Sequence, residues 1–141
     1  MDEYLKKTKG IDYDKNGDIA SSGNINKDII NQFYEHEFYN VQQKHSFDRN
    51  EFDFSFVKGL EFEDAVATLT YFTALIISQN IKKNFDNEIE IILCGGGRRN
   101  LALVNHIKKL LKYKIKLIDE FSVDGDFIES QAFAYLSIRS Y

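Results

Sequence analysis

The sequence predicts an α/β fold in which parallel strands are joined by crossover helices. From residue 61 onward, stretches with helical spacing of apolar residues alternate with short β-branched runs, in the order helix, strand, helix, strand, helix. This alternation is typical of a parallel sheet, because parallel neighbours need a long crossover connection. A run of glycines directly after the first strand adds a candidate ligand-binding loop.

Length and composition limit the alternatives. The chain has 141 residues, of which 43% are hydrophobic and 28% charged, which is enough for one domain but small for a complete two-lobed enzyme. A net charge of −4, with basic residues spread along the chain, argues against a nucleic-acid partner. A single cysteine, and no apolar run near the roughly 18 residues of a membrane span, predict a cytoplasmic protein without disulfides or membrane contact.

Residues 1–60 are mainly polar, and we expect them to form an irregular and partly helical surface segment. Turn signals lie at residues 14–17 and 21–24, and a short helix is predicted from Lys27 to about Tyr34. Residues 12–19 match the first half of a calcium-binding EF-hand loop, but Gly23 stands where that loop needs a bidentate glutamate. A plain Asx turn is therefore expected.

An α/β core is expected over residues 61–141, beginning with a long helix from Glu61 to about Asn84. Acids lie in its first turn, and its apolar residues cover most of its sides. A helix of this kind is usually packed between layers.

Two strands and two further helices follow. Residues 89–93 predict a buried strand, a helix follows with an apolar stripe from Leu101 to Leu111, and residues 114–118 predict a second strand. Asp126 then opens a last helix, which we expect to complete the core.

The loop after the first predicted strand carries the strongest functional signal. Gly95, Gly96 and Gly97 follow the strand, and Asn100 precedes the next helix. Glycines at the mouth of a parallel strand let the backbone approach a nucleotide closely, and the following helix offers N–H groups to a ligand. A tight strand-to-helix turn without a ligand is the simpler alternative.

A small Rossmann-type nucleotide binder is a second interpretation of this loop. Asp119 and Glu120 fall just past the second strand, about where an acid would hold a ribose hydroxyl. The fingerprint is incomplete, because Asn100 occupies the place of its third glycine.

The remaining candidate residues favour structural roles. Cys94 has no histidine near it in sequence, which favours a buried structural thiol over a nucleophile. The histidines His36, His45 and His106 lack metal-ligand spacing, and we expect them on surfaces. Asp126 and Glu129 are spaced like a helix capping box, so Glu129 by itself is expected to be a cap.

Several of these segments together resemble the anhydro-N-acetylmuramic acid kinase family in the family's order. The matching segments are residues 13–17 with 20–23, residues 46–52, residues 64–70, Cys94-Gly95-Gly96-Gly97 with Asn100 and Leu101, and residues 126–129 with 132–136. The spacing of Gly95 and Gly96 to Asn100 also fits the adenosine-binding loop of actin-like sugar kinases.

The resemblance implies an actin-like ATPase fold whose two lobes close over ATP and a sugar, with this chain forming part of the C-terminal lobe. It implies ATP-dependent opening of the ring of 1,6-anhydro-N-acetylmuramic acid by water, with phosphate placed on the 6-oxygen, during peptidoglycan recycling. Carried over by position, Gly95, Gly96, Gly97 and Asn100 would line the nucleotide cleft, and Glu129 would lie at the sugar side.

Departures from the family narrow this expectation. The family's N-terminal lobe, which has the phosphate- and Mg²⁺-binding loop and the catalytic aspartate, has no counterpart in the sequence, so we expect a chain that is inactive alone and supplies no catalytic residue. His45 replaces the family's usual lysine.

The implied cofactors are ATP and a Mg²⁺ held largely by the other lobe. The expected partners are the anhydro amino sugar, an N-terminal-lobe polypeptide and a second copy in a homodimer. A non-catalytic remnant or interaction module is the main alternative.

Overall fold

A computed structural model describes residues 1–34, 54–85 and 89–140. The chain forms two compact units, Met1–Thr73 and Ala74–Tyr141. The division falls inside the long helix α5 (Phe62–Asn84), which occurs where the sequence predicts it. Each unit has its own cluster of buried apolar side chains.

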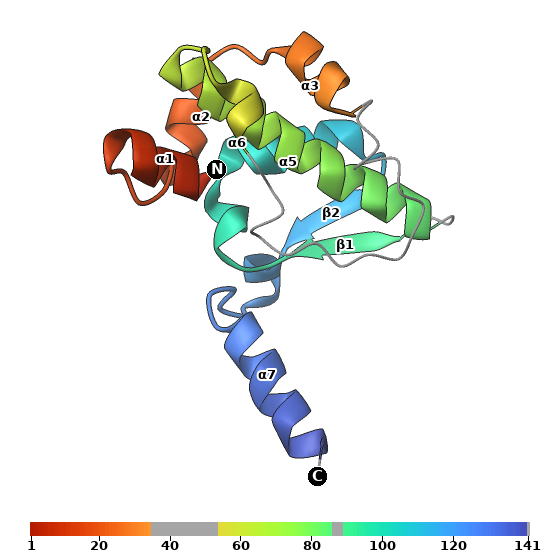
Figure 1. Cartoon of the computed structure of the whole chain (residues 1–141). Helices are drawn as coiled ribbons and strands as arrows, with labels where there is room; N and C mark the ends of the chain where they lie inside the picture. The colour runs from red at the N-terminus through yellow and green to blue at the C-terminus, as the bar shows by residue number, and fades with distance from the viewer. Residues whose placement is uncertain (35–53, 86–88, 141) are drawn as a thin grey trace. The chain divides into compact units, whose positions relative to one another are not determined.

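The first unit is more helical than the sequence predicts. It contains α1 (Asp2–Lys9), α2 (Asp18–Ser22) and α3 (Lys27–Tyr34) before the first half of α5 (Figure 1). The short helix predicted at α3 is confirmed, and α1 and α2 are further helices whose positions were not predicted. The end signals of α1 were present in the sequence: acids in its first turn, lysines in its last and a left-handed Gly10 after it.

Apolar packing in the first unit centres on the start of α5. Val57, Ala65 and Leu69 form its buried cluster. Gly23 lies against the backbone of the first turn of α5, because a Cβ there would be 2.1 Å from the carbonyl oxygen of Glu63. The first unit therefore has a core of its own and is not only a surface segment.

The predicted Asx-type turn was wrong, because the Asp14 carboxylate binds N–H groups five and six residues further along the chain instead of the one two residues on. One carboxylate oxygen of Asp14 accepts a hydrogen bond from the Ile19 N–H at 2.9 Å, and the other accepts one from the Ala20 N–H at 3.0 Å. Both oxygens of this buried side chain are thus used to cap α2. In the described part of the chain, no group of three or more His, Cys, Asp or Glu side chains could hold a metal ion.

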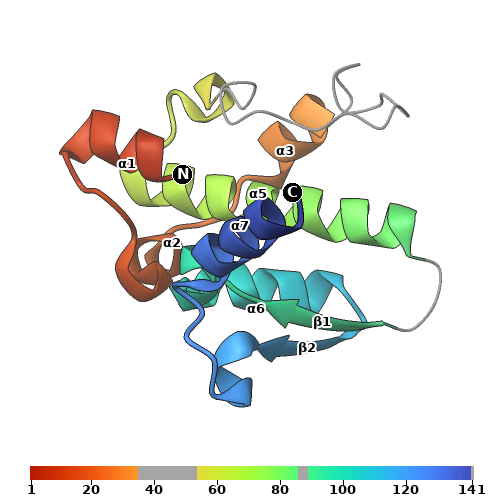
Figure 2. The same ribbon diagram turned by 90° about the horizontal axis from the view of Figure 1, so that it is seen from below.

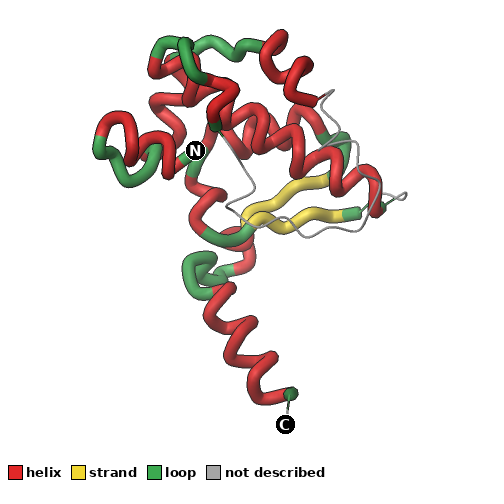
Figure 3. The backbone as a smooth tube through the Cα atoms, in the orientation of Figure 1, coloured by secondary structure: helices red, strands yellow, loops and turns green. Residues whose placement is uncertain are grey.

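The second unit contains the predicted parallel strand pair. Strand β1 (Glu90–Leu93) is followed by α6 (Leu101–Leu110) and then by β2 (Lys114–Leu117), which pairs with β1 in parallel. Figure 3 shows the two strands side by side. The α/β class and the crossover helix between parallel strands are therefore confirmed.

The two faces of the strand pair differ in their surroundings. Ile91 and Ile115 are register partners. Both pack against a cluster formed by Ala74 of α5, Ile107 of α6 and Leu111, the C-cap residue of α6. Figure 2 shows these helices along the same side of the strands. On the other face the Ile92 side chain is 44% exposed, so the prediction of a buried strand holds for one face only.

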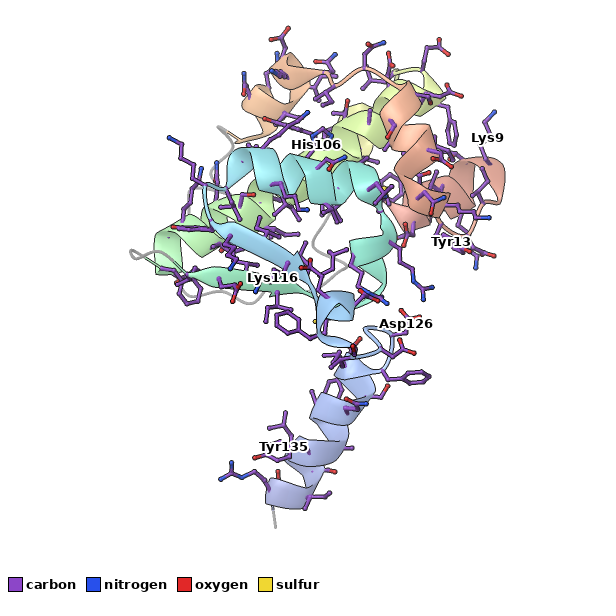
Figure 4. The ribbon with its side chains drawn as sticks, turned by 180° about the vertical axis from the view of Figure 1, so that it is seen from behind. Lys9, Tyr13, His106, Lys116, Asp126 and Tyr135 are labelled. Carbon is purple, nitrogen blue, oxygen red and sulfur yellow. The ribbon has the colours of Figure 1, made fainter. Side chains whose placement is uncertain are left out.

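The opposite face of the pair is charged. Its Glu90 carboxylate lies 2.6 Å from the Lys116 ammonium and 3.3 Å from that of Lys114, which is the neighbour of Glu90 in register. Figure 4 labels Lys116 on its strand. Such exposed ion pairs contribute little to stability.

The last helix differs most from expectation. Helix α7 (Ile128–Arg139) contains no buried residue, and its exposed side chains include Phe133 at 66% and Ile138 at 75% exposure. The prediction that it completes the core of this chain was wrong. Apolar residues occur on several sides of α7, which is the pattern of a helix that packs against more protein. Within the described ranges, no helix has both the length and the apolar character needed to cross a bilayer.

Candidate functional site

The candidate site lies at the edge of the sheet where both parallel strands end. A short 3₁₀ helix (Gly96–Arg99) follows β1, and another (Ile118–Phe121) follows β2. Because the carboxyl ends of parallel strands meet at the same edge, the loops that follow them lie close together. This edge of an open α/β sheet is where ligands usually bind.

Gly95 and Gly96 form an open backbone surface at this edge. Gly95 has φ 76° and ψ 178°, a conformation that is essentially restricted to glycine. A Cβ added at either residue would meet no other group within 4 Å, whereas at Gly97 it would contact a Leu103 methyl at 3.6 Å. At Gly95 and Gly96, therefore, no other described group lies against the place that a side chain would take.

Asn100 joins the glycine loop to α6 as the N-cap of that helix. Its side-chain oxygen accepts a hydrogen bond from the Leu103 N–H at 2.9 Å, and the residue is buried. A structural role for Asn100 is therefore evident, and a contact with a ligand stays a prediction.

Removing this cap should destabilise the chain. Asn100→Ala is expected to lower the free energy of unfolding by about 1 kcal/mol, because the Leu103 N–H loses its acceptor. Asn100→Asp keeps an acceptor of the same shape and is the matched control. Urea unfolding followed by circular dichroism measures both, and equal stabilities of the two variants would contradict this capping role.

An arginine next to the glycines organises the loops of this edge. The Arg98 side chain is 4% exposed. Its Nε and Nη2 donate to the two carboxylate oxygens of Asp119 at 2.7 and 3.0 Å, and its Nη1 donates to Asp126 at 2.6 Å and to the Gly95 carbonyl oxygen at 2.9 Å. The exposed Arg99 also pairs with Asp126. We call Arg98, Asp119 and Asp126 the arginine clamp.

Charge pairing in the clamp shifts the pKa of two of its groups. The Arg98 guanidinium lowers the pKa of Asp119, and its bonds to Asp119 and Asp126 raise the pKa of Arg98 further above its usual value. A carboxyl with a lowered folded-state pKa stabilises the fold above its unfolded-state pKa, and this contribution is lost as the pH falls through the folded value. Arg98 and Asp119 are therefore both charged at neutral pH.

The arginine clamp was not predicted from the sequence. Its members are 21 and 28 residues apart in the chain, and only the fold brings them together. The available signal was a basic residue in the loop after one strand and acids in the loop after the next.

These contacts argue against the Rossmann-type interpretation. Both oxygens of Asp119 are bound by Arg98, and a Glu120 oxygen accepts the Leu117 N–H at 2.8 Å. Each acid that would have held a ribose hydroxyl is thus used within the protein.

The capping box predicted for the last helix was wrong. Helix α7 begins at Ile128 with Phe127 as its N-cap, and no side chain caps it. The Asp126 carboxylate instead binds Arg98 and Arg99; Figure 4 labels Asp126 in the loop before α7. Glu129 lies exposed in the first turn of α7, so its proposed contact with a sugar stays a prediction.

Two further expectations concern single side chains. Cys94 is exposed, so its predicted burial was wrong; the chain leaves β1 here and enters the open loop. His106 lies half-buried on α6, and this burial lowers its pKa (Figure 4). His36 and His45 lie outside the described residues, as does the segment 46–52.

Comparison with known proteins identifies the family. The family model described as anhydro-N-acetylmuramic acid kinase matches residues 1–141. The chain belongs to the anhydro-N-acetylmuramic acid kinase family. The resemblance derived from the ordered motifs is thereby confirmed.

Individual members of the anhydro-N-acetylmuramic acid kinase family align with 99% of the chain. The chain is 49% identical to the anhydro-N-acetylmuramic acid kinase of Pelagibacter ubique (strain HTCC1062), 34% to that of Zymomonas mobilis and 33% to that of Methylorubrum populi. It spans only 39%, 38% and 37% of the lengths of these relatives.

Proposed function

We propose that the chain forms the nucleotide-binding part of the C-terminal lobe of an anhydro-N-acetylmuramic acid kinase with an actin-like ATPase fold. The observation that carries this proposal is the β1–α6–β2 unit with Gly95 and Gly96 open at its carboxyl edge, in a chain that matches the family model from end to end. A parallel unit with a glycine loop at this edge suits the close approach of a nucleotide.

In the proposed reaction ATP is the phosphoryl donor and 1,6-anhydro-N-acetylmuramic acid is the acceptor. Water opens the anhydro ring and the 6-oxygen receives the phosphate, which places the reaction in cytoplasmic recycling of peptidoglycan. Gly95, Gly96, Gly97 and Asn100 of this chain would line the nucleotide cleft, and Glu129 would lie at the sugar side. The Mg²⁺ ion and the catalytic groups would be supplied largely by the N-terminal lobe.

The exposed apolar side chains of helix α7 favour a partner protein for this chain. Its Phe133, Tyr135, Leu136 and Ile138 side chains are each more than half exposed, and the chain spans about 38% of a relative's length. We propose that an N-terminal lobe of the same family covers α7. Burial of an apolar side chain of this size stabilises an interface by about 2 kcal/mol. A homodimer that buries α7 against a second copy is the competing arrangement.

Reconstitution tests the proposed function. The 141-residue chain is mixed with the separately produced N-terminal portion of the Pelagibacter ubique relative. We expect ATP-dependent phosphorylation of the anhydro sugar only when both polypeptides are present, because phosphoryl transfer needs groups from both lobes. A stable complex without turnover would contradict the proposal, and size-exclusion chromatography of the chain alone detects the competing homodimer.

The same assay tests the proposed place of Glu129. Glu129→Gln is expected to lower kcat/KM for the sugar by about 100-fold and to change KM for ATP by less than about threefold, because a charged hydrogen-bond acceptor is lost only at the sugar. Glu61→Gln, at an exposed acid in the other unit, is the matched control. If Glu129→Gln impairs the use of the sugar and of ATP equally, the placement of Glu129 at the sugar side is contradicted.

A further inference from the structure

The arginine clamp holds the glycine loop by its backbone. Arg98 binds the Gly95 carbonyl oxygen, and the Gly95 N–H donates to the Gly125 carbonyl oxygen at 3.1 Å. Both backbone polar groups of Gly95 are therefore fixed by the clamp and by the loop before α7. This matters because Gly95 has a left-handed φ, which the flexible backbone of a glycine does not maintain without such contacts.

The Arg98 guanidinium is closely packed against Gly125. A Cβ at Gly125 would lie 2.4 Å from Arg98 Nε and 2.6 Å from its Cζ, so the absence of a side chain there leaves room for the planar group. The Arg98 nitrogens make directed contacts with two carboxylates and one carbonyl group. Lysine has one compact ammonium group and cannot reproduce this set of contacts.

The clamp also connects two parts of the proposed site. Asp119 lies in the loop after β2, and Asp126 lies two residues before α7, the helix that carries Glu129. Through Arg98, both are bound to the loop after β1. Direct contacts through Arg98 therefore join the glycine loop to the residues just before α7.

We infer that Arg98 is a positioning residue that holds the Gly95–Gly96 backbone in its ligand-ready conformation and couples it to the start of α7. Arg98 is not itself a nucleotide ligand, because its side chain is enclosed by protein groups. The inference rests on the proposed nucleotide site and adds to it a residue that acts through the loop.

Hydrogen exchange of the 141-residue chain, measured by mass spectrometry with and without MgATP, tests this inference. Without nucleotide, Arg98→Lys is expected to speed amide exchange in segments 95–98 and 124–127 about tenfold, with unchanged exchange in the middle of α6. MgATP should protect both segments in the wild type, and the variant should lose the protection of 124–127. Asp119→Asn, which keeps side-chain shape, should give the same pattern if Arg98→Lys fails to fold.

Matched controls separate positioning from general stability. Arg139→Lys, at an exposed arginine in the last turn of α7, should leave exchange in both segments unchanged. A merely structural role of Arg98 would speed exchange throughout the second unit, and that outcome would overturn the inference, as would unchanged exchange at 95–98. If MgATP protects no segment of the wild type, the proposed function fails, while the exchange without nucleotide still decides whether Arg98 holds the loop.

Discussion

A valine in place of Gly96 is expected to lower the affinity of the chain for ATP by about 100-fold, which corresponds to about 2.7 kcal/mol. The new side chain would occupy the space beside the loop, where no other protein group lies within 4 Å of the added Cβ. Gly96 does not have a positive φ, so the fold should tolerate the change. Isothermal titration calorimetry with MgATP measures the affinity, and thermal unfolding checks the stability.

The control for the valine substitution lies in the same unit. Asn105→Val places the same side chain at an exposed position of α6 and should leave ATP affinity unchanged. If the Gly96→Val chain binds ATP as tightly as the wild type, the nucleotide does not lie on Gly96.

Alanine in place of Gly23 is expected to have the largest effect on stability. Its Cβ would lie 2.1 Å from the Glu63 carbonyl oxygen and 2.7 Å from the Asp64 backbone nitrogen. These atoms belong to the backbone of α5 and cannot rotate away, so the segment around Gly23 must separate from the helix. We expect a loss of about 3 kcal/mol or more in the free energy of unfolding, measured by urea denaturation.

Gly10→Ala is the matched control for this change. Gly10 has φ 69° but has no neighbour within 4 Å of an added Cβ, so only the left-handed backbone opposes the substitution. Its expected cost is about 1 kcal/mol. If both alanine variants lose the same stability, the close contact of Gly23 with α5 does not make this position more sensitive than Gly10, since Gly23 has an extended backbone that other residues can adopt.

Sequence reasoning succeeded where a pattern is local and repeated. Helix α5 and the β1–α6–β2 unit were predicted because apolar spacing identifies a face within one element, and short β-branched runs between helices favour parallel pairing. Helix α1 was missed because its apolar content is low, with Tyr4 and Leu5 as its only large apolar residues. Helix α1 forms nevertheless, because it packs within the first unit, where its Leu5 side chain is fully buried.

The candidate site was only partly predictable. The glycine loop is visible in sequence because glycine has a specific backbone role, and the open space beside Gly95 and Gly96 agrees with it. The arginine clamp depends on contacts between loops that are distant in the chain, so no short motif contains it. Asp126 shows the difficulty: its spacing to Glu129 predicted a helix cap, but Arg98 and Arg99 compete for its carboxylate.

The most direct measurement is an amide NMR titration of the 141-residue chain with MgATP. If the carboxyl edge of the strand pair is the nucleotide site, the largest saturable shifts will fall on the amides of residues 95–100, with smaller shifts at 124–127 through the arginine clamp. An absence of shifts at millimolar MgATP, or shifts confined to residues away from this edge, would contradict the assignment of this chain as the nucleotide-binding part of the kinase.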